Sequence, residues 1–247
     1  MTKIVIKKKI KSFNKIISVD SDKSLSIRSL LIGSQSYGLC KIKNLSKSGD
    51  ILSTISGLRK LGIKIFFKNK ICYLYGNGLS GFDYKKNILI NAGNSGTFAR
   101  LLLGLIIKTP HKIKLVGDDS LSKRDFKRIA KPLKKFGANL RLKNDYTLPL
   151  IITGSKNLKP IKYLENIGSA QVKSCILFAG ARTTGKTFIK VPLAKRSRDH
   201  TERLFRYLKL PIKVKRQKNF DLIEISKIKK IKPFNYKIPS DLSSCAF

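Results

Sequence analysis

The stretch with the clearest chemical pattern runs from Asp22 to Arg28 and is followed by apolar residues. Ser24 is a residue type that caps the free backbone N–H groups of a helix, so we expect a helix to begin there. Lys23 lies just ahead of the helix. Arg28 follows Ser24 by one helical turn, so the side chains of Ser24 and Arg28 can face the same ligand. A helix N-terminus with a hydroxyl and two cations is typical of a site for a phosphorylated anion. The alternative is a capped amphipathic helix without a ligand.

Two further stretches repeat this pattern of small polar residues before an apolar helix. Ser24, Ser95 and Ser169 are roughly 71 and 74 residues apart, a period longer than that of short solenoid repeats. Each is followed by a polar loop and a second helix. We therefore interpret residues 21–225 as three α/β units. Three such helix starts that converge would surround one ligand with aligned backbone dipoles.

The polar loops and helix starts also carry groups that bind anions. Arg124 precedes a helix in the second unit and would present a planar fork to a carboxylate or a phosphate, although a solvated surface cation is the alternative. In the third unit, Gln171 and Lys173 lie in the first turn of a helix, and Arg198 precedes the next one. These residue types indicate a binder of phosphate and carboxylate groups that has no obvious general base.

The residues after Arg198 have a structural interpretation. We expect Asp199 to cap the following helix and Glu202 to close a capping box with it. We interpret His200 as structural, because nothing near it in the sequence completes a dyad or a metal set.

The elements that must hold these residues are predicted from apolar spacing and from turn residues. Glycines follow two of the expected second helices, at Gly62 and Gly137, and end them. The expected helices are 24–33, 51–61, 95–104, a helix ending at 136, 169–180 and 199–208. The expected strands are 39–43, 63–67, 71–75, 113–116, 138–142, 187–191 and 212–214. Residues 1–20 are expected to be strand material, and 226–247 a linker followed by the start of a fourth, truncated unit.

The composition bounds the class of protein. The chain has 247 residues, 42% of them hydrophobic, and a formal net charge of +39. This charge suits nucleic acid, anionic lipid or small anionic substrates. A nucleic-acid-binding protein should show clustered cations with interleaved aromatic residues, whereas the lysines here are dispersed along the sequence. We therefore expect no nucleic acid partner and attribute much of the charge to a general composition bias.

The cysteines are Cys40, Cys72, Cys175 and Cys245, without a C-x-x-C pair or a nearby histidine. This spacing favours reduced, buried thiols and no metal site. No apolar run reaches the length of a membrane span, and the N-terminus lacks a signal-peptide apolar block. We expect a cytoplasmic protein.

Taken together, five motifs resemble the 5-enolpyruvylshikimate-3-phosphate (EPSP) synthase family. Each motif alone is weak, but all five occur in the family's order, one at each expected place in the repeats. The resemblance covers essentially this whole chain and about the first half of the family's length. The motifs are Asp22-Lys23-Ser24 with Arg28, Asn94-Ser95-Gly96-Thr97, Gly117 to Arg124, Ser169 to Ser174, and Arg198 to Glu202.

The resemblance implies two domains of inverted α/β repeats, each with three βαβαββ-like units around a pseudo-threefold axis. They close over shikimate 3-phosphate and phosphoenolpyruvate. It implies a substrate-binding domain in 21–225, a strand segment of the second domain in 1–20, and a linker with the truncated start of that domain in 226–247.

The reaction that the resemblance implies transfers the enolpyruvyl group of phosphoenolpyruvate to the 5-hydroxyl of shikimate 3-phosphate, in chorismate and aromatic amino acid biosynthesis. A tetrahedral intermediate expels phosphate. The family uses no cofactor and no metal, and we expect a monomer at full length. The family's general-base aspartate and later cationic clamps would lie beyond Phe247. We therefore expect the 247-residue chain to bind shikimate 3-phosphate weakly and to turn over nothing.

The resemblance also implies roles for individual residues. Lys23 is the catalytic residue within this chain, bridging both substrates and stabilising charge on the enolpyruvyl side. The residues implied for shikimate 3-phosphate are Lys23, Ser24, Arg28, Ser169, Ala170, Gln171 and Arg198. Those implied for phosphoenolpyruvate are Lys23, Gly96, Arg124 and Gln171.

Within the same fold, UDP-N-acetylglucosamine enolpyruvyl transferase is the nearest alternative. Its reactive cysteine loop would lie near Arg124, and neither Cys72 nor Cys175 fits that place. A basic nucleic-acid-binding protein is the alternative from a different class.

Overall fold

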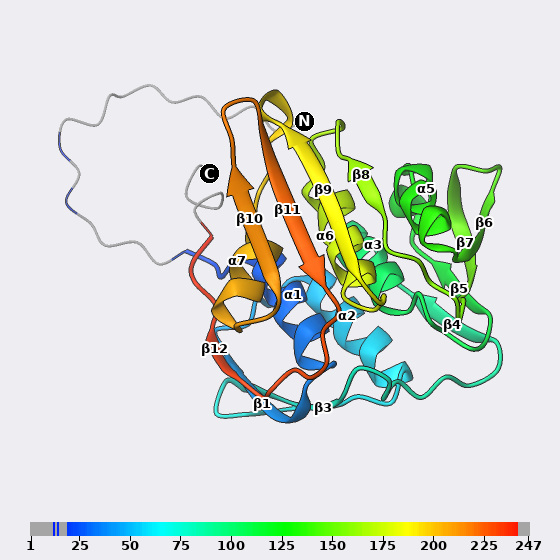
Figure 1. Cartoon of the computed structure of the whole chain (residues 1–247). Helices are drawn as coiled ribbons and strands as arrows, with labels where there is room; N and C mark the ends of the chain where they lie inside the picture. The colour runs from blue at the N-terminus through cyan, green and yellow to red at the C-terminus, as the bar shows by residue number, and fades with distance from the viewer. Residues whose placement is uncertain (1–11, 13, 15–18, 242–247) are drawn as a thin grey trace.

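The computed structural model describes residues 12, 14 and 19–241, which form three four-stranded sheets with helices between them (Figure 1). The strand orders are β12-β1-β3-β2, β4-β5-β7-β6 and β8-β9-β11-β10. In each sheet the first-named edge strand pairs in parallel with its neighbour, and the remaining pairs are antiparallel. The predicted α/β class and the three repeated units are confirmed.

The second and third units each run through the βαβαββ order without interruption. The second unit consists of β4 (Ile88–Asn91), α3 (Gly96–Leu105), β5 (Ile113–Val116), α4 (Asp119–Ser122), α5 (Lys127–Phe136), β6 (Asn139–Lys143) and β7 (Thr147–Thr153). The third consists of β8 (Lys162–Leu164), α6 (Ala170–Gly180), β9 (Lys186–Pro192), the 3₁₀ turn η1 (Leu193–Lys195), α7 (His200–Tyr207), β10 (Ile212–Arg216) and β11 (Phe220–Ser226).

The first unit takes its leading strand from the far end of the chain. It consists of α1 (Lys23–Gly33), β1 (Tyr37–Lys43), α2 (Gly49–Lys60), β2 (Lys64–Lys68) and β3 (Ile71–Asn77). Strand β12 (Asn235–Lys237) pairs in parallel with β1, in the place that β4 and β8 occupy in their sheets. The chain thus returns to the first sheet after the third unit is complete.

The ends of the second helices follow the glycine prediction. Gly62, which follows α2 after Leu61, and Gly137, directly after α5, adopt positive φ angles of 82° and 104°. A positive φ is favourable for glycine and costly for most other residues. The chain therefore leaves each helix at these positions and enters strands β2 and β6.

The core lies between the helices and the inner faces of the sheets. Helices α3 and α6 are buried along most of their length and pack directly on each other. A Cβ on Gly104 would lie 2.4 Å from the Cys175 carbonyl oxygen, so only glycine permits this close approach. Helix α1 packs on α2, α3 and α7, which places the first helices of all three units in the middle of the molecule (Figure 1).

Two capping predictions are wrong. Helix α1 begins at Lys23, and its cap is Asp22, whose carboxylate accepts from the Leu25 N–H at 2.8 Å; Ser24 lies inside the first turn. Asp199 occupies the N-cap position of α7 but makes no side-chain cap bond. Its carboxylate pairs instead with Arg203 at 2.8 Å, so no capping box with Glu202 forms.

Of the sequence's terminal predictions, the strand material within 1–18, apart from residues 12 and 14, and the helix start at 242–247 lie outside the described residues. Among the residues described, no helix is long and apolar enough to cross a membrane. Cys40, Cys72 and Cys175 are free thiols and buried, as predicted. The domain boundaries remain predictions.

Candidate substrate-binding site

Arg28 is a buried cation in the second turn of α1 (2% exposed). Its Nε donates to Thr201 Oγ1 at 2.7 Å, its Nη2 to Ser174 Oγ at 3.0 Å, and its Nη1 to the Ser24 carbonyl at 2.9 Å. Burial lowers its pKa to about 10, which nearby Glu202 partly opposes. Arg28 therefore stays protonated at neutral pH, and no carboxylate of the described chain makes an ion pair with it.

The first turns of α3 and α6 lie side by side. Ser95 and Ser169 cap these helices as predicted, through hydroxyls that accept from backbone N–H groups three residues on. The Gln171 side chain spans the two turns: its Nε2 donates to Thr97 Oγ1 at 3.0 Å, and its Oε1 accepts from Arg100 Nη1 at 2.5 Å. Two of the predicted helix starts therefore meet at Gln171.

Arg100 was not predicted from the sequence. It lies on α3, is 6% exposed, and packs its guanidinium over the Phe126 ring. Burial lowers its pKa to about 10, with further contributions from Arg128 and Arg124. A lone cation in an otherwise apolar helix, one turn after Gly96, is the sequence signal that could have identified it.

Gly96 and Arg124 are neighbours, as their shared predicted role requires. A Cβ on Gly96 would lie 3.0 Å from Arg100 Nη1 and 3.2 Å from Arg124 Nη1. Arg124 Nη2 donates to Asn94 Oδ1 at 2.6 Å and to Ser120 Oγ at 3.2 Å. Glycine thus leaves room for two guanidinium groups at the start of α3.

Lys23 is linked to the start of α3 by way of helix α2, on which its partner Asp50 lies. Its Nζ lies 3.3 Å from Asp50 Oδ2, and its side chain is 46% exposed. Ser53, one turn further along α2, packs against Gly93, where a Cβ would lie 2.6 Å from Ser53 Oγ. Gly93 precedes Asn94, which accepts a hydrogen bond from Arg124. Lys23 thus borders the same edge as the α3 start.

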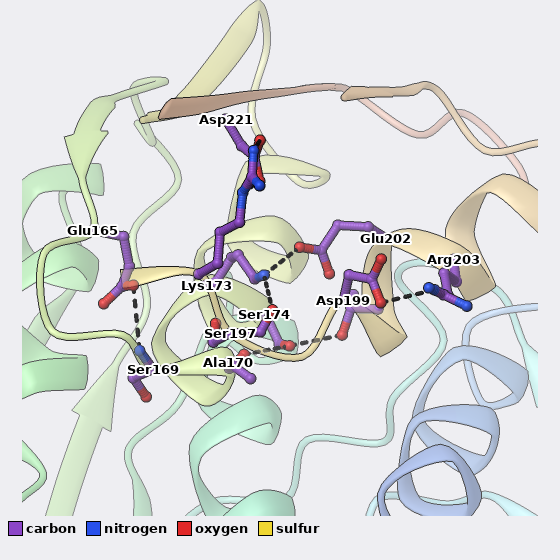
Figure 2. A network of polar contacts seen from close by, with 12 residues as sticks. Glu165, Ser169, Ala170, Lys173, Ser174, Ser197, Asp199, Glu202, Arg203 and Asp221 are labelled. Atoms are coloured by element: carbon purple, nitrogen blue, oxygen red, sulfur yellow. Dashed lines mark hydrogen bonds and ion pairs between the residues drawn. The ribbon is translucent and has the colours of Figure 1, made fainter. Parts of the chain in front are cut away.

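Helices α6 and α7 are bound to each other by polar side chains (Figure 2). Ser174 Oγ lies 2.7 Å from Thr201 Oγ1 and donates to the Ala170 carbonyl at 2.6 Å. Lys173 and Glu202 form a buried ion pair of 2.7 Å. The Lys173 ammonium is therefore committed to Glu202, and it is not available at the helix start as an anion ligand.

A buried carboxylate holds the turn that leads into α6. Glu165 is fully buried, and its oxygens accept from the N–H groups of Ile167, Gly168 and Ser169 at 3.1, 3.1 and 3.2 Å. The turn therefore presents Ser169 in one fixed position. Glu165 was not predicted from the sequence; an acidic residue three positions before a Gly-Ser pair, in a chain with few acids, is the signal that could have identified it.

The loop before α7 borders a cavity of about 600 Å³ that also reaches the start of α1. Arg198 is exposed in this loop. His200 Nε2 lies 3.8 Å from Asp22 Oδ2, and its structural interpretation remains a prediction. The residues lining the cavity include Asp22, Leu25, Arg198, His200, Arg203 and Tyr207.

The assembled group is suited to hold anions. It combines the N-terminal turns of α1, α3 and α6 with buried Arg28 and Arg100 and the more exposed Lys23, Arg124 and Arg198. Helix N-termini and guanidinium groups both favour phosphate and carboxylate. Within the described part of the chain, no group of three His, Cys, Asp or Glu residues could hold a metal ion. These groups can position an anionic ligand and stabilise its negative charge.

Comparison with known proteins agrees with this geometry. The family model described as EPSP synthase (3-phosphoshikimate 1-carboxyvinyltransferase) matches residues 7–247. The 3-phosphoshikimate 1-carboxyvinyltransferase of Sulfurihydrogenibium sp. is 39% identical over 97% of this chain and 55% of its own length. That of Clostridium tetani is 41% identical over 94% of this chain and 51% of its own.

A solved structure of EPSP synthase from Acinetobacter baumannii superposes with a TM-score of 0.84 at 37% identity, over 93% of this chain and 51% of that one. The chain therefore spans about half the length of the curated relatives it matches. Sequence motifs, fold and site geometry agree with these matches, and the chain belongs to the EPSP synthase family.

Proposed function

We propose that this chain provides the shikimate 3-phosphate-binding half of an enolpyruvyl transferase. The reaction transfers the enolpyruvyl group of phosphoenolpyruvate to the 5-hydroxyl of shikimate 3-phosphate and releases phosphate. The supporting observation is the meeting of three helix N-termini around two buried guanidinium groups, Arg28 and Arg100, that form no ion pair with a carboxylate of the described chain. We place the protein in the cytoplasm, as a monomer at full length.

The proposed roles follow the positions of the groups. Arg28 and Arg198 hold shikimate 3-phosphate together with the α6 start, Ser169 to Gln171. Arg124 binds phosphoenolpyruvate in the space left by Gly96. Lys23, the more exposed cation at the edge of both groups, neutralises charge that develops on the enolpyruvyl side.

Because the chain spans about half its relatives' length, we expect the 247-residue polypeptide to bind shikimate 3-phosphate weakly and to form no product. A coupled assay for released phosphate checks this. Phosphate release that depends on both substrates would show that the described residues complete a catalytic site by themselves.

The structure shows one feature that favours the nucleic-acid alternative. On the outer face of the first sheet, Phe66 stacks on Tyr73 at 5.1 Å, and Lys41 lies 6.0 Å over the Tyr73 ring. Cations and aromatic rings therefore do cluster in space. However, Phe66 also stacks on Tyr75, and Lys64 covers the Tyr75 ring, so the ring faces that bases would need are already occupied.

Calorimetric titration distinguishes the two functions. Shikimate 3-phosphate should bind with a single saturable heat, and shikimate, which lacks the phosphate, should bind far more weakly. A mobility-shift assay with single-stranded DNA at two salt concentrations runs beside it. Steeply salt-dependent DNA binding without any response to shikimate 3-phosphate would favour the nucleic-acid function instead.

A further inference from the structure

The α6–α7 interface contains an ion pair that touches none of the proposed ligand groups directly. Lys173 Nζ lies 2.7 Å from Glu202 Oε1, and the two side chains are 4% and 2% exposed. The second carboxylate oxygen, Glu202 Oε2, makes no hydrogen bond with the described residues. Burying an ion pair in which one carboxylate oxygen has no hydrogen-bond partner is costly, because both charges lose their hydration.

Stability alone does not account for such a pair. Replacing a buried ion pair with apolar side chains of similar size is often neutral or even stabilising. The feature that an apolar pair would lack is the second contact of the ammonium group: Lys173 Nζ also donates to the Ser197 carbonyl at 3.4 Å. Ser197 directly precedes Arg198. In Figure 2, dashed lines lead from Lys173 both to Glu202 and to Ser197.

The residues next to Lys173 and Glu202 form a second contact between α6 and α7. Ser174 follows Lys173 on α6, and Thr201 precedes Glu202 on α7; these two hydroxyls lie 2.7 Å apart, and both accept from Arg28. Two adjacent contacts thus join the helices. One fixes the guanidinium of Arg28, and the other reaches the backbone of the loop that carries Arg198.

We propose that Lys173 and Glu202 are positioning residues of the shikimate 3-phosphate site, which set the place of the 196–199 loop and hence of Arg198. Glu202 holds the ammonium in a fixed direction, and the ammonium holds the Ser197 carbonyl. This inference rests on the proposed function, because Arg198 is taken as a ligand. The pair itself stays out of contact with substrate.

The test uses a variant in which both charges are removed, since a single change would leave the other charge buried and unpaired. In K173M/E202M the side chains keep their approximate volume but lose the contact with Ser197. The matched control is K186M/E224M, which removes the more exposed Lys186–Glu224 pair of 3.0 Å in the same unit. Circular dichroism and thermal unfolding confirm that each variant is folded.

We expect K173M/E202M to weaken shikimate 3-phosphate binding about tenfold, because a small misplacement of a binding group has effects of this size or larger. In an R198Q background, the same double change should weaken binding less than twofold, since its effect acts through Arg198. K186M/E224M should change affinity in neither background. A purely structural role predicts equal losses in both backgrounds, and that result would overturn the proposal, as would unchanged affinity in folded K173M/E202M.

Amide hydrogen exchange supplies a measurement that does not depend on a ligand. Exchange in residues 196–199 should accelerate in K173M/E202M and remain at the wild-type rate in K186M/E224M. If wild-type protein fails to bind shikimate 3-phosphate, the proposed function is lost, and exchange still decides whether the pair holds the loop. Unchanged exchange there would refute the positioning role.

Discussion

Arg100 on α3 and Gln171 on α6 are joined by a hydrogen bond of 2.5 Å, although they lie 71 residues apart in the sequence. The same amide donates to Thr97 at 3.0 Å, so both ends of the Gln171 side chain are fixed. The bond leaves Arg100 with its positive charge, because an amide oxygen carries no countercharge. The two helix starts are thus connected without neutralising the cation beside them.

This relationship predicts the effect of Gln171→Glu. A carboxylate would still accept from Arg100 and would gain ion-pair energy, so the free energy of unfolding should be unchanged or higher. Anion binding should weaken at least tenfold, because the new charge neutralises the cation. Calorimetry with shikimate 3-phosphate and urea unfolding measure the two effects. The control Gln217→Glu in an exposed turn should change neither.

Two glycines of α3 should respond differently to the same added methyl group. In Gly104→Ala, the Cβ would lie 2.4 Å from the Cys175 carbonyl oxygen, and overpacking of this kind costs about 1–3 kcal/mol or more. In Gly96→Ala, the nearest atoms are the ends of the Arg100 and Arg124 side chains, at 3.0 and 3.2 Å, which can move aside. Urea unfolding should show a large loss for Gly104→Ala and almost none for Gly96→Ala. Equal losses would contradict the close α3–α6 packing.

Glu165 should be among the most sensitive carboxylates of the chain. It accepts three backbone N–H groups in the turn before α6. Glu165→Ala would leave these donors without their acceptor, and we expect a cost of about 3 kcal/mol in the free energy of unfolding. The control Glu224→Ala, which breaks a more exposed ion pair, should cost no more than about 1 kcal/mol. Chemical denaturation compares the two, and a cost for Glu165→Ala as small as the control's would show that the turn does not depend on this carboxylate.

His200 predicts a pH dependence of stability. Burial lowers its pKa below the ordinary value, while Asp22 opposes that shift. The unfolded chain therefore takes up a proton at this imidazole more readily than the folded chain does. The contribution of His200 is fully present above the ordinary pKa of about 6.5 and is lost as the pH falls through the lowered folded value.

The measurement compares urea unfolding at pH 7.5 and pH 5 for wild type, His200→Asn and the control His111→Asn. Wild type and His111→Asn should lose more stability on acidification than His200→Asn does. An identical loss in all three proteins would show that His200 does not contribute to the pH dependence.

Local signals in the sequence predicted much of the fold. The repeat of Ser95 and Ser169 before apolar helices is a local pattern, and both serines do cap their helices. Gly62 and Gly137 end helices because positive φ favours glycine wherever it occurs. The predicted strands 63–67 and 71–75 correspond to β2 and β3, which pair with each other.

The relationships that sequence reasoning missed are those between distant residues. Strand β12 completes the first sheet from the other end of the chain. A strand of three residues is too short to show a periodic pattern in the sequence. Glu202 fits a capping box with Asp199 by spacing, but a buried ammonium on α6 outcompetes that local bond. The sequence could not decide between Asp22 and Ser24 as the cap of α1, because both residue types are suitable caps. In the structure the cap is Asp22. The binding roles assigned to the site residues remain predictions.

The central claim is that the starts of α1 and α6 bind shikimate 3-phosphate, and nuclear magnetic resonance titration of the isotopically labelled chain with this ligand tests it most directly. We predict saturable shifts confined to amides near Ser24, Arg28 and Ser169 to Gln171, which disappear in Arg28→Gln and persist in the control Arg59→Gln. Shifts scattered over surface lysines without saturation, or shifts that survive the loss of Arg28, would contradict the account.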